Sequence, residues 1–515
     1  MSHPKQPLAP LHGAQLAVAT FGVSLATFMQ VLDTTIANVS VPTIAGSMGI
    51  SATQGTWVIT SFTVSTAISM PLTGRLSERL GQVRLFLLAT TLFTLASVLC
   101  GLSVNMPMLI AARVLQGAVA GPLMPLSQAL MLSIYPREKR GQALALWATI
   151  AVVAPIVGPI LGGYISDNAS WPWIFFINGP VGVLAVVLTT ESLRRMESTL
   201  HKPPIDWMGL VLLAVWVGVL QVMLDLGSDE NWFDSPLIIS LTAVTAVVFC
   251  YWLVWELNHP YPIVDLSLFR DRNFAVGAGG GSLIYAAFFG SSVLLPLVLQ
   301  TQYGYTATWA GLVVAPVGIA PILGSRFVGR NYHRVDPRVL ITGSFLVTAL
   351  VMWWRSHAST DWGLWNLLEP QALLGVGVMI MFTPLTAVML STLDPHRSAS
   401  ALGVSSFMRL TASGFGASIF TSFWQSREAV HHTRLAEAIT VYDPQRSSVF
   451  DFLTGHGLGP GQAYGAIDFT VTNQAFVMAA NDVFWMASLA IVVVTSIIWL
   501  ARPPFHFMQA AVASE

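Results

Sequence analysis

The sequence predicts an all-α polytopic membrane protein with fourteen spanning helices. Of its 515 residues, 54% are apolar and only 10% are charged, whereas a soluble chain carries roughly 25% charged residues. So few charges cannot cover a water-facing surface of this size, which excludes a soluble enzyme, a disordered protein and a nucleic-acid-binding protein. Long runs without charges and a weak internal repeat indicate the same class.

Runs without charges locate the spans, because a membrane helix needs about 20 mostly apolar residues. The first six spans lie in or beside residues 15–39, 56–73, 85–112, 114–136, 141–166 and 168–190. The next two lie in 207–224 and 235–255. The last six lie in 273–325, which holds two, and in 339–354, 370–393, 410–426 and 483–501. Each helix satisfies its own backbone hydrogen bonds, so we expect a helix bundle.

An internal repeat predicts two related halves of six helices, as many transporters have. Gly74-Arg75, followed by Arg79, comes after the second span, and Gly329-Arg330, followed by Arg334, comes after the tenth. The predicted segments are an N-tail at 1–14, the first half at 15–192, two inserted helices at 207–256, the second half at 274–501 with an outer loop at 425–481, and a C-tail at 502–515.

Lys and Arg predict that both termini are cytoplasmic, because basic loops stay on that side of a membrane. In this orientation eighteen basic residues lie in or beside inner segments and two lie within spans. The four outer ones are Arg355, Arg427, Arg434 and Arg446. The first ten residues have no apolar core or cleavage pattern, so we interpret them as a cytoplasmic tail rather than a signal peptide.

Four motifs, in the expected order, resemble signatures of the major facilitator superfamily. The first-helix motif of its fourteen-span drug:proton antiporters is matched by Leu32, Asp33, Ile36, Asn38 and Val39. The signature between the second and third helices is matched by Gly74, Glu78, Arg79, Gly81 and Arg84. The fourth-helix motif is matched by Leu109, Arg113, Gln116 and Gly117. The fifth-helix motif typical of antiporters is matched by Ala154, Pro155, Gly158, Pro159, Gly162 and Gly163.

The resemblance implies the major facilitator fold and the export of hydrophobic drugs, antibiotics and uncouplers across the cell inner membrane, driven by proton entry. It also implies a periplasmic adaptor protein and an outer-membrane channel as partners, besides membrane lipid. A proton-coupled transporter of a single metabolite or nutrient is the alternative, because it would share the fold. The sequence has no nucleotide-binding loop, zinc spacing or Ser-His-Asp arrangement, so we expect neither an enzyme nor a cofactor other than the proton gradient.

Asp33 is the predicted proton carrier. A charge inside a spanning helix costs roughly 2.5 to 3.5 kcal/mol on insertion scales, so Asp33 should be partnered, protonated or hydrated. A rise of about 1.5 Å per residue places Arg113 at a similar depth. A nearby cation favours the carboxylate and dehydration favours the acid, so we expect Arg113 to control proton binding. A permanent structural ion pair is the alternative.

Polar side chains that recur at helical spacing beside Asp33 predict a hydrated cavity. Methionine and aromatic side chains adapt to varied apolar ligands, although each of them could instead be ordinary packing. Arg409 lies about 15 Å into span 13, as an anchor for anionic substrates or a donor to unwound backbone. The predicted substrate-binding residues are Met29, Gln30, Asn38, Phe62, Gln116, Met124, Phe288, Met381, Phe382 and Arg409.

Two motifs are predicted to control conformational change. The inner loop with Gly74, Glu78, Arg79 and Arg84 is expected to latch the outward-facing state, although most such loops are only basic turns. On span 5 the small residues permit close helix contact and the prolines favour a bend. We expect this contact to seal the inner ends, with simple packing as the alternative; its residues are Pro155, Gly158, Pro159 and Gly162.

Two further regions lie at or beyond the ends of spans. A loop as long as 425–481 is seldom structureless, so we expect a short helical hairpin that docks a partner, or else a mobile lid. Asp225 and Glu256 stand at opposite ends of the inserted helices, where long polar side chains can reach the membrane interface. We therefore expect no coupling role for either acid.

Overall fold

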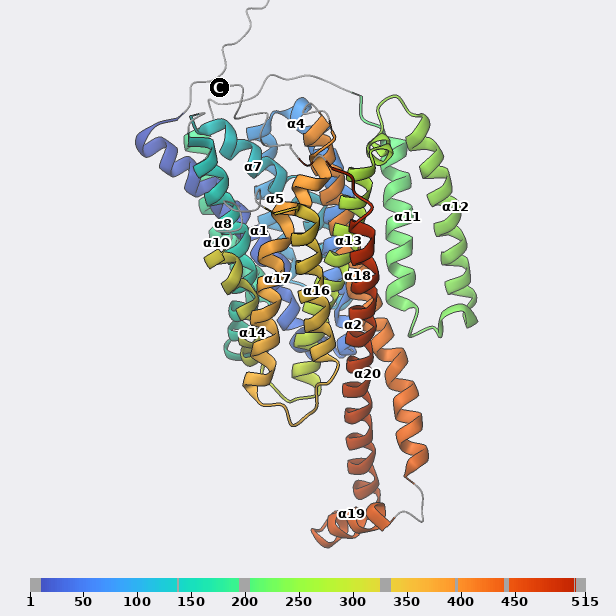
Figure 1. The fold of residues 1–515 in the computed structure, drawn as a ribbon. Helices are drawn as coiled ribbons and strands as arrows, with labels where there is room; N and C mark the ends of the chain where they lie inside the picture. The colour runs from blue at the N-terminus through green and yellow to red at the C-terminus, as the bar shows by residue number, and fades with distance from the viewer. Residues whose placement is uncertain are drawn as a thin grey trace, which may run out of the picture.

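The computed structural model describes residues 11–136, 139–193, 204–324, 335–393, 397–439, 444–503 and 505. All regular structure in these ranges is helical, and the helices run roughly side by side (Figure 1). Eleven helical segments are long and apolar enough to cross a membrane. Helical structure also occupies the other three predicted spans, in α3 with α4, in α8 and in α18. The predicted fold class is therefore confirmed.

The N-terminal group holds the first helices of the chain. Its long members are α1 (Gly13–Met48), α3 (Trp57–Ser69), α5 (Gln82–Gly101), α6 (Met106–Ala120), α7 (Leu123–Ile134), α8 (Arg140–Asn168) and α10 (Asn178–Leu193). Its short members are α2 (Ala52–Gly55), η1 (Met70–Leu72), α4 (Thr73–Leu80) and α9 (Trp173–Phe176).

The inserted pair and the C-terminal group follow. The pair is α11 (Trp207–Leu226) and α12 (Pro236–Asn258), with turns η3 (Trp232–Asp234) and η4 (Leu266–Arg270). The C-terminal group is α13 (Arg272–Thr301), α14 (Ala307–Val314), η5 (Ala315–Gly318), α16 (Pro337–Arg355), α17 (Leu364–Leu390), α18 (Ser398–Ala438), α19 (Pro444–Gly455) and α20 (Pro460–Ile498). The second copy of the predicted repeat, Gly329 to Arg334, lies outside the described residues.

Polar caps fix where several spans begin, because a short polar side chain accepts a hydrogen bond from the first helical turn. Asn105 Oδ1 accepts from the backbone N–H of Met108 at 2.9 Å, at the start of α6. Asp271 Oδ1 accepts from the N–H of Phe274 at 2.8 Å, at the start of α13. The polar residues between apolar runs thus set the helix starts.

Two helices of the C-terminal group extend far beyond the bundle and form the projecting hairpin, residues 425–481 (Figure 1). α18 has 41 residues and α20 has 39, which at 1.5 Å per residue gives about 60 Å each, against a hydrocarbon core of about 30 Å. α19 lies across the far end. The hairpin confirms the predicted helical form but is not short.

Contacts between α18 and α20 explain why this segment is helical despite its charges. Trp424 Nε1 donates to the backbone oxygen of Phe476 at 2.8 Å, and Asp482 accepts from Arg427 at 2.6 Å. His431 Nε2 lies 2.8 Å from the same Asp482 carboxylate. The charges that suggested a loop therefore pair across two helices.

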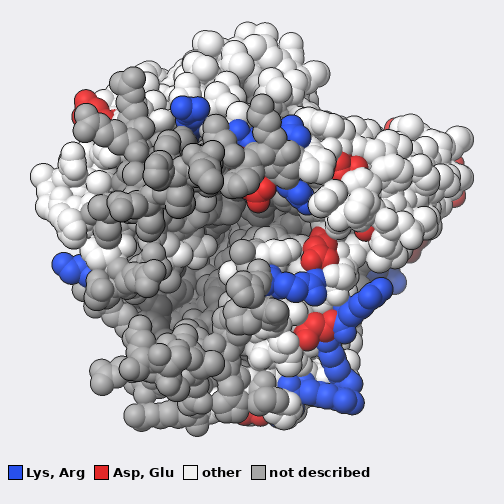
Figure 2. All heavy atoms as spheres, turned by 90° about the horizontal axis from the view of Figure 1, so that it is seen from above, with Lys and Arg blue, Asp and Glu red and all other residues white. Residues whose placement is uncertain are grey.

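The bundle has two distinct ends. The terminal end carries both described chain ends: Leu11 donates its N–H to the oxygen of Ile134, and Arg502 donates to Asn273. Figure 2 views this end and shows Lys, Arg, Asp and Glu side chains exposed on it. The opposite end carries the projecting hairpin, and we call it the hairpin end.

The N-terminal and C-terminal groups meet near the hairpin end. Gln300 of α13 donates to the oxygen of Val39 at 2.8 Å, and Gln425 of α18 donates to Thr53 at 2.7 Å. α11 packs against both α3 and α18, whereas α12 packs mainly against α11. The inserted helix α11 therefore touches both groups.

Candidate functional site

Asp33 forms a complete polar network inside the N-terminal group. Its side chain is fully buried. Arg113 NH1 of α6 donates to Asp33 Oδ2 at 2.6 Å. Gln116 Nε2 and Asn178 Nδ2 donate to Asp33 Oδ1 at 3.0 and 2.7 Å. The predicted pairing of Asp33 with Arg113 at one depth is therefore present.

Arg113 is held on every side as well. Its Nε donates to the backbone oxygen of Val58 at 2.9 Å, and its NH1 donates to Gln116 Oε1 at 2.7 Å. The guanidinium lies 4.1 Å from the centre of the Phe62 ring, where a cation is attracted to the aromatic face. Gln116 follows Arg113 by three residues, so both share one face of α6.

These contacts suit a carboxylate, because all three partners are donors. Each carboxylate oxygen accepts hydrogen bonds from donors, and a cation compensates the charge. Buried ion pairs are tolerated only as pairs, because removal of one partner leaves an uncompensated charge. A proton on Asp33 would therefore have to displace Arg113. Asn178, which sequence reasoning missed as a site residue, is a lone amide at the start of an apolar run.

Most of the polar residues beside Asp33 are buried. Gln30 and Asn38 are each 4% exposed, and Thr27 is fully buried. Gln30 Nε2 donates to the backbone oxygen of Ala120 at 3.2 Å. Thr27 bonds to its own helix, whereas Gln30 Oε1 and Asn38 Oδ1 are buried without a hydrogen-bond partner. The hydrated cavity therefore stays a prediction.

A second cluster, the Arg409 cluster, lies in the C-terminal group and consists of Tyr285, Phe288, Phe382 and Arg409. The Arg409 guanidinium lies 5.7 Å from the centre of the Phe382 ring. The Tyr285 ring lies 6.1 and 6.4 Å from those of Phe288 and Phe382. The structure thus joins three predicted substrate residues through Tyr285, which no sequence motif singled out.

The other predicted substrate residues lie elsewhere. Met29 is buried in the core of the N-terminal group, and Met381 in that of the C-terminal group. Phe62 and Gln116 belong to the Asp33 network. Met124, in α7, is partly buried.

The glycines of the fifth-helix motif hold α8 against α1. A Cβ added at Gly158 would collide with Thr35 Oγ1, and one added at Gly162 would collide with the backbone oxygen of Ile36. Close backbone approach was the predicted use of these glycines, and the geometry confirms it.

The same stretch also contacts the other group of helices. A Cβ at Gly311 of α14 would collide with the backbone oxygen of Pro159. Pro159 lies about 29 Å along α8 from Arg140 at the terminal end, so the contact lies towards the hairpin end. α8 continues as one helix through Pro155 and Pro159. The predicted sealing role of this stretch stays a prediction.

The motif after the second span is helical rather than a loop. Gly74 and Glu78 lie on the exposed surface of α4. The helix ends at Gly81, whose φ of 90° lies in the left-handed region that favours glycine. Arg79 and Arg84 both interact with other residues. The predicted latch role of these residues stays a prediction.

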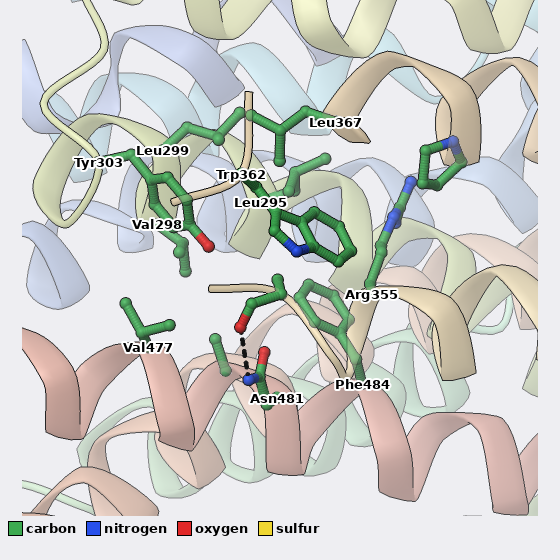
Figure 3. A pocket seen from close by; sticks show the side chains of 13 residues that line it. Leu295, Val298, Leu299, Tyr303, Arg355, Trp362, Leu367, Val477, Asn481 and Phe484 are labelled. Carbon is green, nitrogen blue, oxygen red and sulfur yellow. Dashed lines mark hydrogen bonds between the residues drawn. The ribbon is translucent and has the colours of Figure 1, made fainter. Parts of the chain in front are cut away.

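Arg355 was predicted to lie on the outer side, and its side chain is only 4% exposed. It lines a pocket between α13, α16, α17 and α20, together with Trp362 and Phe484 (Figure 3). Its NH1 donates to Ser291 Oγ at 2.5 Å, and its NH2 has no hydrogen-bond partner. Within the described residues no carboxylate pairs with it. Sequence reasoning did not single out Arg355 as a site residue, because its burial among apolar side chains depends on how the helices pack.

Known proteins resemble the chain along nearly its whole length. A sequence profile of the Major Facilitator Superfamily matches residues 23–417. The Multidrug export protein EmrB of Escherichia coli strain K12 is 50% identical over 501 residues, which cover 96% of this chain and 97% of EmrB. The Fatty acid resistance protein FarB of Neisseria gonorrhoeae is 48% identical over 497 residues, which cover 96% and 98%.

A solved structure shows the same fold at low sequence identity. The crystal structure of the peptide transporter POT in complex with sulfate is 13% identical, with a TM-score of 0.63, and the match covers 96% of this chain and 98% of that one. The protein is a multi-pass membrane transporter and not an enzyme. It belongs to the major facilitator superfamily, in the branch that contains EmrB and FarB.

Proposed function

We propose that the protein is a proton-driven antiporter that exports hydrophobic drugs, antibiotics and uncouplers across the cell inner membrane. The observation that carries the proposal is the buried Asp33–Arg113 pair, a titratable acid held by one cation inside a membrane helix bundle. Its relatives EmrB and FarB are named for multidrug export and fatty acid resistance. One charge moving through 100 mV supplies about 2.3 kcal/mol.

The network gives protonation a mechanical consequence. A proton on Asp33 neutralises the carboxylate and weakens its bond to Arg113, which then keeps Val58 and Gln116 as partners. Asp33 stands on α1 and Arg113 on α6, so the bond ties these two helices. α1 also packs against α8 through Gly158. Movement of α1 relative to α6 would therefore reach the contact between the two groups.

The Arg409 cluster is the proposed substrate site. Its three rings offer apolar faces to aromatic drugs, and Arg409 offers a positive charge to acidic ones. Uncouplers and fatty acids combine an acidic group with an apolar body, so they suit this cluster.

The projecting hairpin is the proposed docking site for a periplasmic adaptor protein, which would connect the transporter to an outer-membrane channel. The distribution of Lys and Arg supports cytoplasmic termini and a hairpin on the outer side. Near its tip Phe452 is 63% exposed and Phe469 is 71% exposed. Exposed aromatic side chains are typical of surfaces that a partner covers.

Transport assays test the function. Proteoliposomes that contain the protein should accumulate a fluorescent hydrophobic dye only when a proton gradient is imposed, and Asp33→Asn should lower this uptake at least tenfold. Unchanged gradient-driven transport in Asp33→Asn would remove Asp33 from the coupling. Gradient-driven movement of a single nutrient, with no drug transport, would support the alternative function.

Docking has its own test. Phe452→Ser with Phe469→Ser should abolish co-purification with the adaptor but leave dye transport in proteoliposomes intact. Trp365→Ser is the matched control, because Trp365 is 73% exposed and lies outside the hairpin. Retained co-purification in the double variant would place the adaptor elsewhere.

A further inference from the structure

A second carboxylate, that of Asp225, lies where the two groups meet. Asp225 stands in the last turn of α11 and is partly buried. Its Oδ2 accepts from Thr60 Oγ1 of α3 at 2.9 Å, and its Oδ1 accepts from Ser418 Oγ of α18. Gln221 Nε2 donates to the same Oδ1 at 2.9 Å. One carboxyl group therefore links the N-terminal group to the C-terminal group.

All three partners of Asp225 are neutral, and the charged side chains on the adjoining helices are engaged or distant. On α18, Arg427 pairs with Asp482, and Arg409 lies nine residues before Ser418, about 14 Å along the helix. Beyond α11, Asp229 accepts from Gln54. α3 has no charged residue, and Glu256 stands at the far end of α12, while Glu428 lies ten residues beyond Ser418.

Such a setting suits a protonated carboxyl group. A carboxylate without a cation is costly at membrane depth, and removal from water favours the neutral acid. Gln221, 5% exposed, has an Oε1 atom that is buried without a partner. Its Nε2 donates to both Asp225 Oδ1 and Ser418 Oγ, so the polar groups around Asp225 form one network of neutral partners. A proton on Asp225 would leave this network without a net charge.

Asp225 has these neutral partners because the N-terminal and C-terminal groups are in contact at the hairpin end. Ser422 of α18 donates to the backbone oxygen of Leu224 at 2.8 Å, and Gln425 of α18 donates to Thr53 at 2.7 Å. If α3 and α18 separate while α11 stays with α18, the bonds from Gln425 to Thr53 and from Thr60 to Asp225 break, water enters and the charged carboxylate becomes favourable. A group that binds a proton better in one of two states shifts the balance between them.

We propose that Asp225 is a second proton-binding residue, which takes up a proton when α3 and α18 close at the hairpin end and gives it up when they open. The inference rests on the proposed function in one respect, because the proton that Asp225 binds would belong to the same transport cycle as the proton on Asp33. It assigns to the inserted helix α11 the role of sensing closure.

Distance measurements between spin labels test this linkage. Labels at Ser51→Cys and Ala429→Cys, both exposed positions, report separation of the two groups at the hairpin end in a Cys250→Ser background, because Cys250 is exposed and Cys100 is buried. Without substrate, the closed population should fall as pH rises from mildly acidic to mildly alkaline. One linked proton changes the open-to-closed ratio by at most about tenfold per pH unit.

Variants separate this inference from the proposed function. Asp225→Asn should stay closed at every pH, and Asp225→Ser, which is also neutral, should likewise lose the pH dependence. Asp33→Asn should keep it. The inference is overturned if Asp225→Asn responds to pH as the unmodified protein does, or if Asp33→Asn alone removes the response. The spin-label measurement needs neither drug nor proton gradient. It therefore tests the role of Asp225 even if the protein does not transport the dye.

Discussion

Asp33 and Asp225 are both acids within spanning helices, yet their surroundings differ in two ways. Asp33 is bonded to a cation and two amides inside one group of helices. Asp225 has only neutral partners, drawn from both groups. Under the two proposals, the cation keeps Asp33 charged at rest while Asp225 is neutral. A proton would then act on helices within one group at Asp33, and on the contact between groups at Asp225.

Loss of the cation should have the largest effect. Arg113→Ala leaves Asp33 fully buried without compensation, which costs about 3 to 5 kcal/mol. We expect thermal unfolding in detergent at a much lower temperature. Asp33→Asn combined with Arg113→Gln should recover much of this stability without recovering transport. If the single variant is as stable as the double one, Asp33 is not held as an ion.

A substitution that blocks the contact between the N-terminal and C-terminal groups should have the second-largest effect. A Cβ at Gly163 of α8 would collide with the backbone oxygen of Ala307, and overpacking typically costs about 1 to 3 kcal/mol. Gly163→Leu should therefore keep the hairpin end open at every pH in the spin-label measurement. Gly46→Leu is the control, because nothing lies within 4 Å of a Cβ at Gly46. Normal closure in Gly163→Leu would show that α8 and α14 do not form the closing contact.

The substrate site should give a smaller and selective effect. Arg409→Gln removes the charge above Phe382 but keeps polar length. Hydrogen bonds to charged groups contribute about 1.5 to 3 kcal/mol, so affinity for acidic substrates should fall about tenfold or more, with neutral dyes little affected. Competition assays with acidic and neutral compounds measure this. Equal loss for both classes would assign Arg409 to structure instead.

An exposed ion pair should give the smallest effect. Asp265 pairs with Arg397 at 2.8 Å at the terminal end. Burial raises the pKa of Asp265, but hydrogen bonds from Ser267 and Arg397 outweigh this, so the pKa lies below its usual value. The pair therefore stabilises the fold above the ordinary carboxyl pKa of about 3.9, and this contribution is lost as pH falls through the folded value.

Asp265→Asn should accordingly cost less than about 1 kcal/mol at neutral pH and leave both transport and the pH dependence of closure unchanged. Thermal unfolding and the spin-label measurement together check this. A clear change in coupling would mean that any lost carboxylate disturbs the cycle, and the contrast between Asp33 and Asp225 would lose its meaning.

The sequence predicted the features that depend on one-dimensional patterns. Apolar runs located the spans, because a bilayer demands about 20 apolar residues whatever the tertiary packing. Helical rise placed Asp33 and Arg113 at one depth, and the structure joins them at 2.6 Å. Glycine spacing predicted the close contact of α8.

What the sequence did not predict depends on which helices face one another. Asn178 and Tyr285 are single polar groups in apolar runs, and only packing brings them to Asp33 and Phe382. Asp225 was expected at the membrane interface, but α3 and α18 close over it. Arg355 was expected on the outer side, but its burial depends on how the helices pack. The helical hairpin was predicted, but its length was not, because it depends on pairing between α18 and α20.

Infrared spectroscopy tests the contrast between the two acids most directly, because a protonated carboxyl group has its own C=O stretching band. In the closed state at neutral pH, the unmodified protein should show such a band, Asp225→Asn should lack it, and Asp33→Asn should retain it. If Asp33→Asn removes the band while Asp225→Asn keeps it, then Asp33 holds the proton, and the roles of the two carboxylates are reversed.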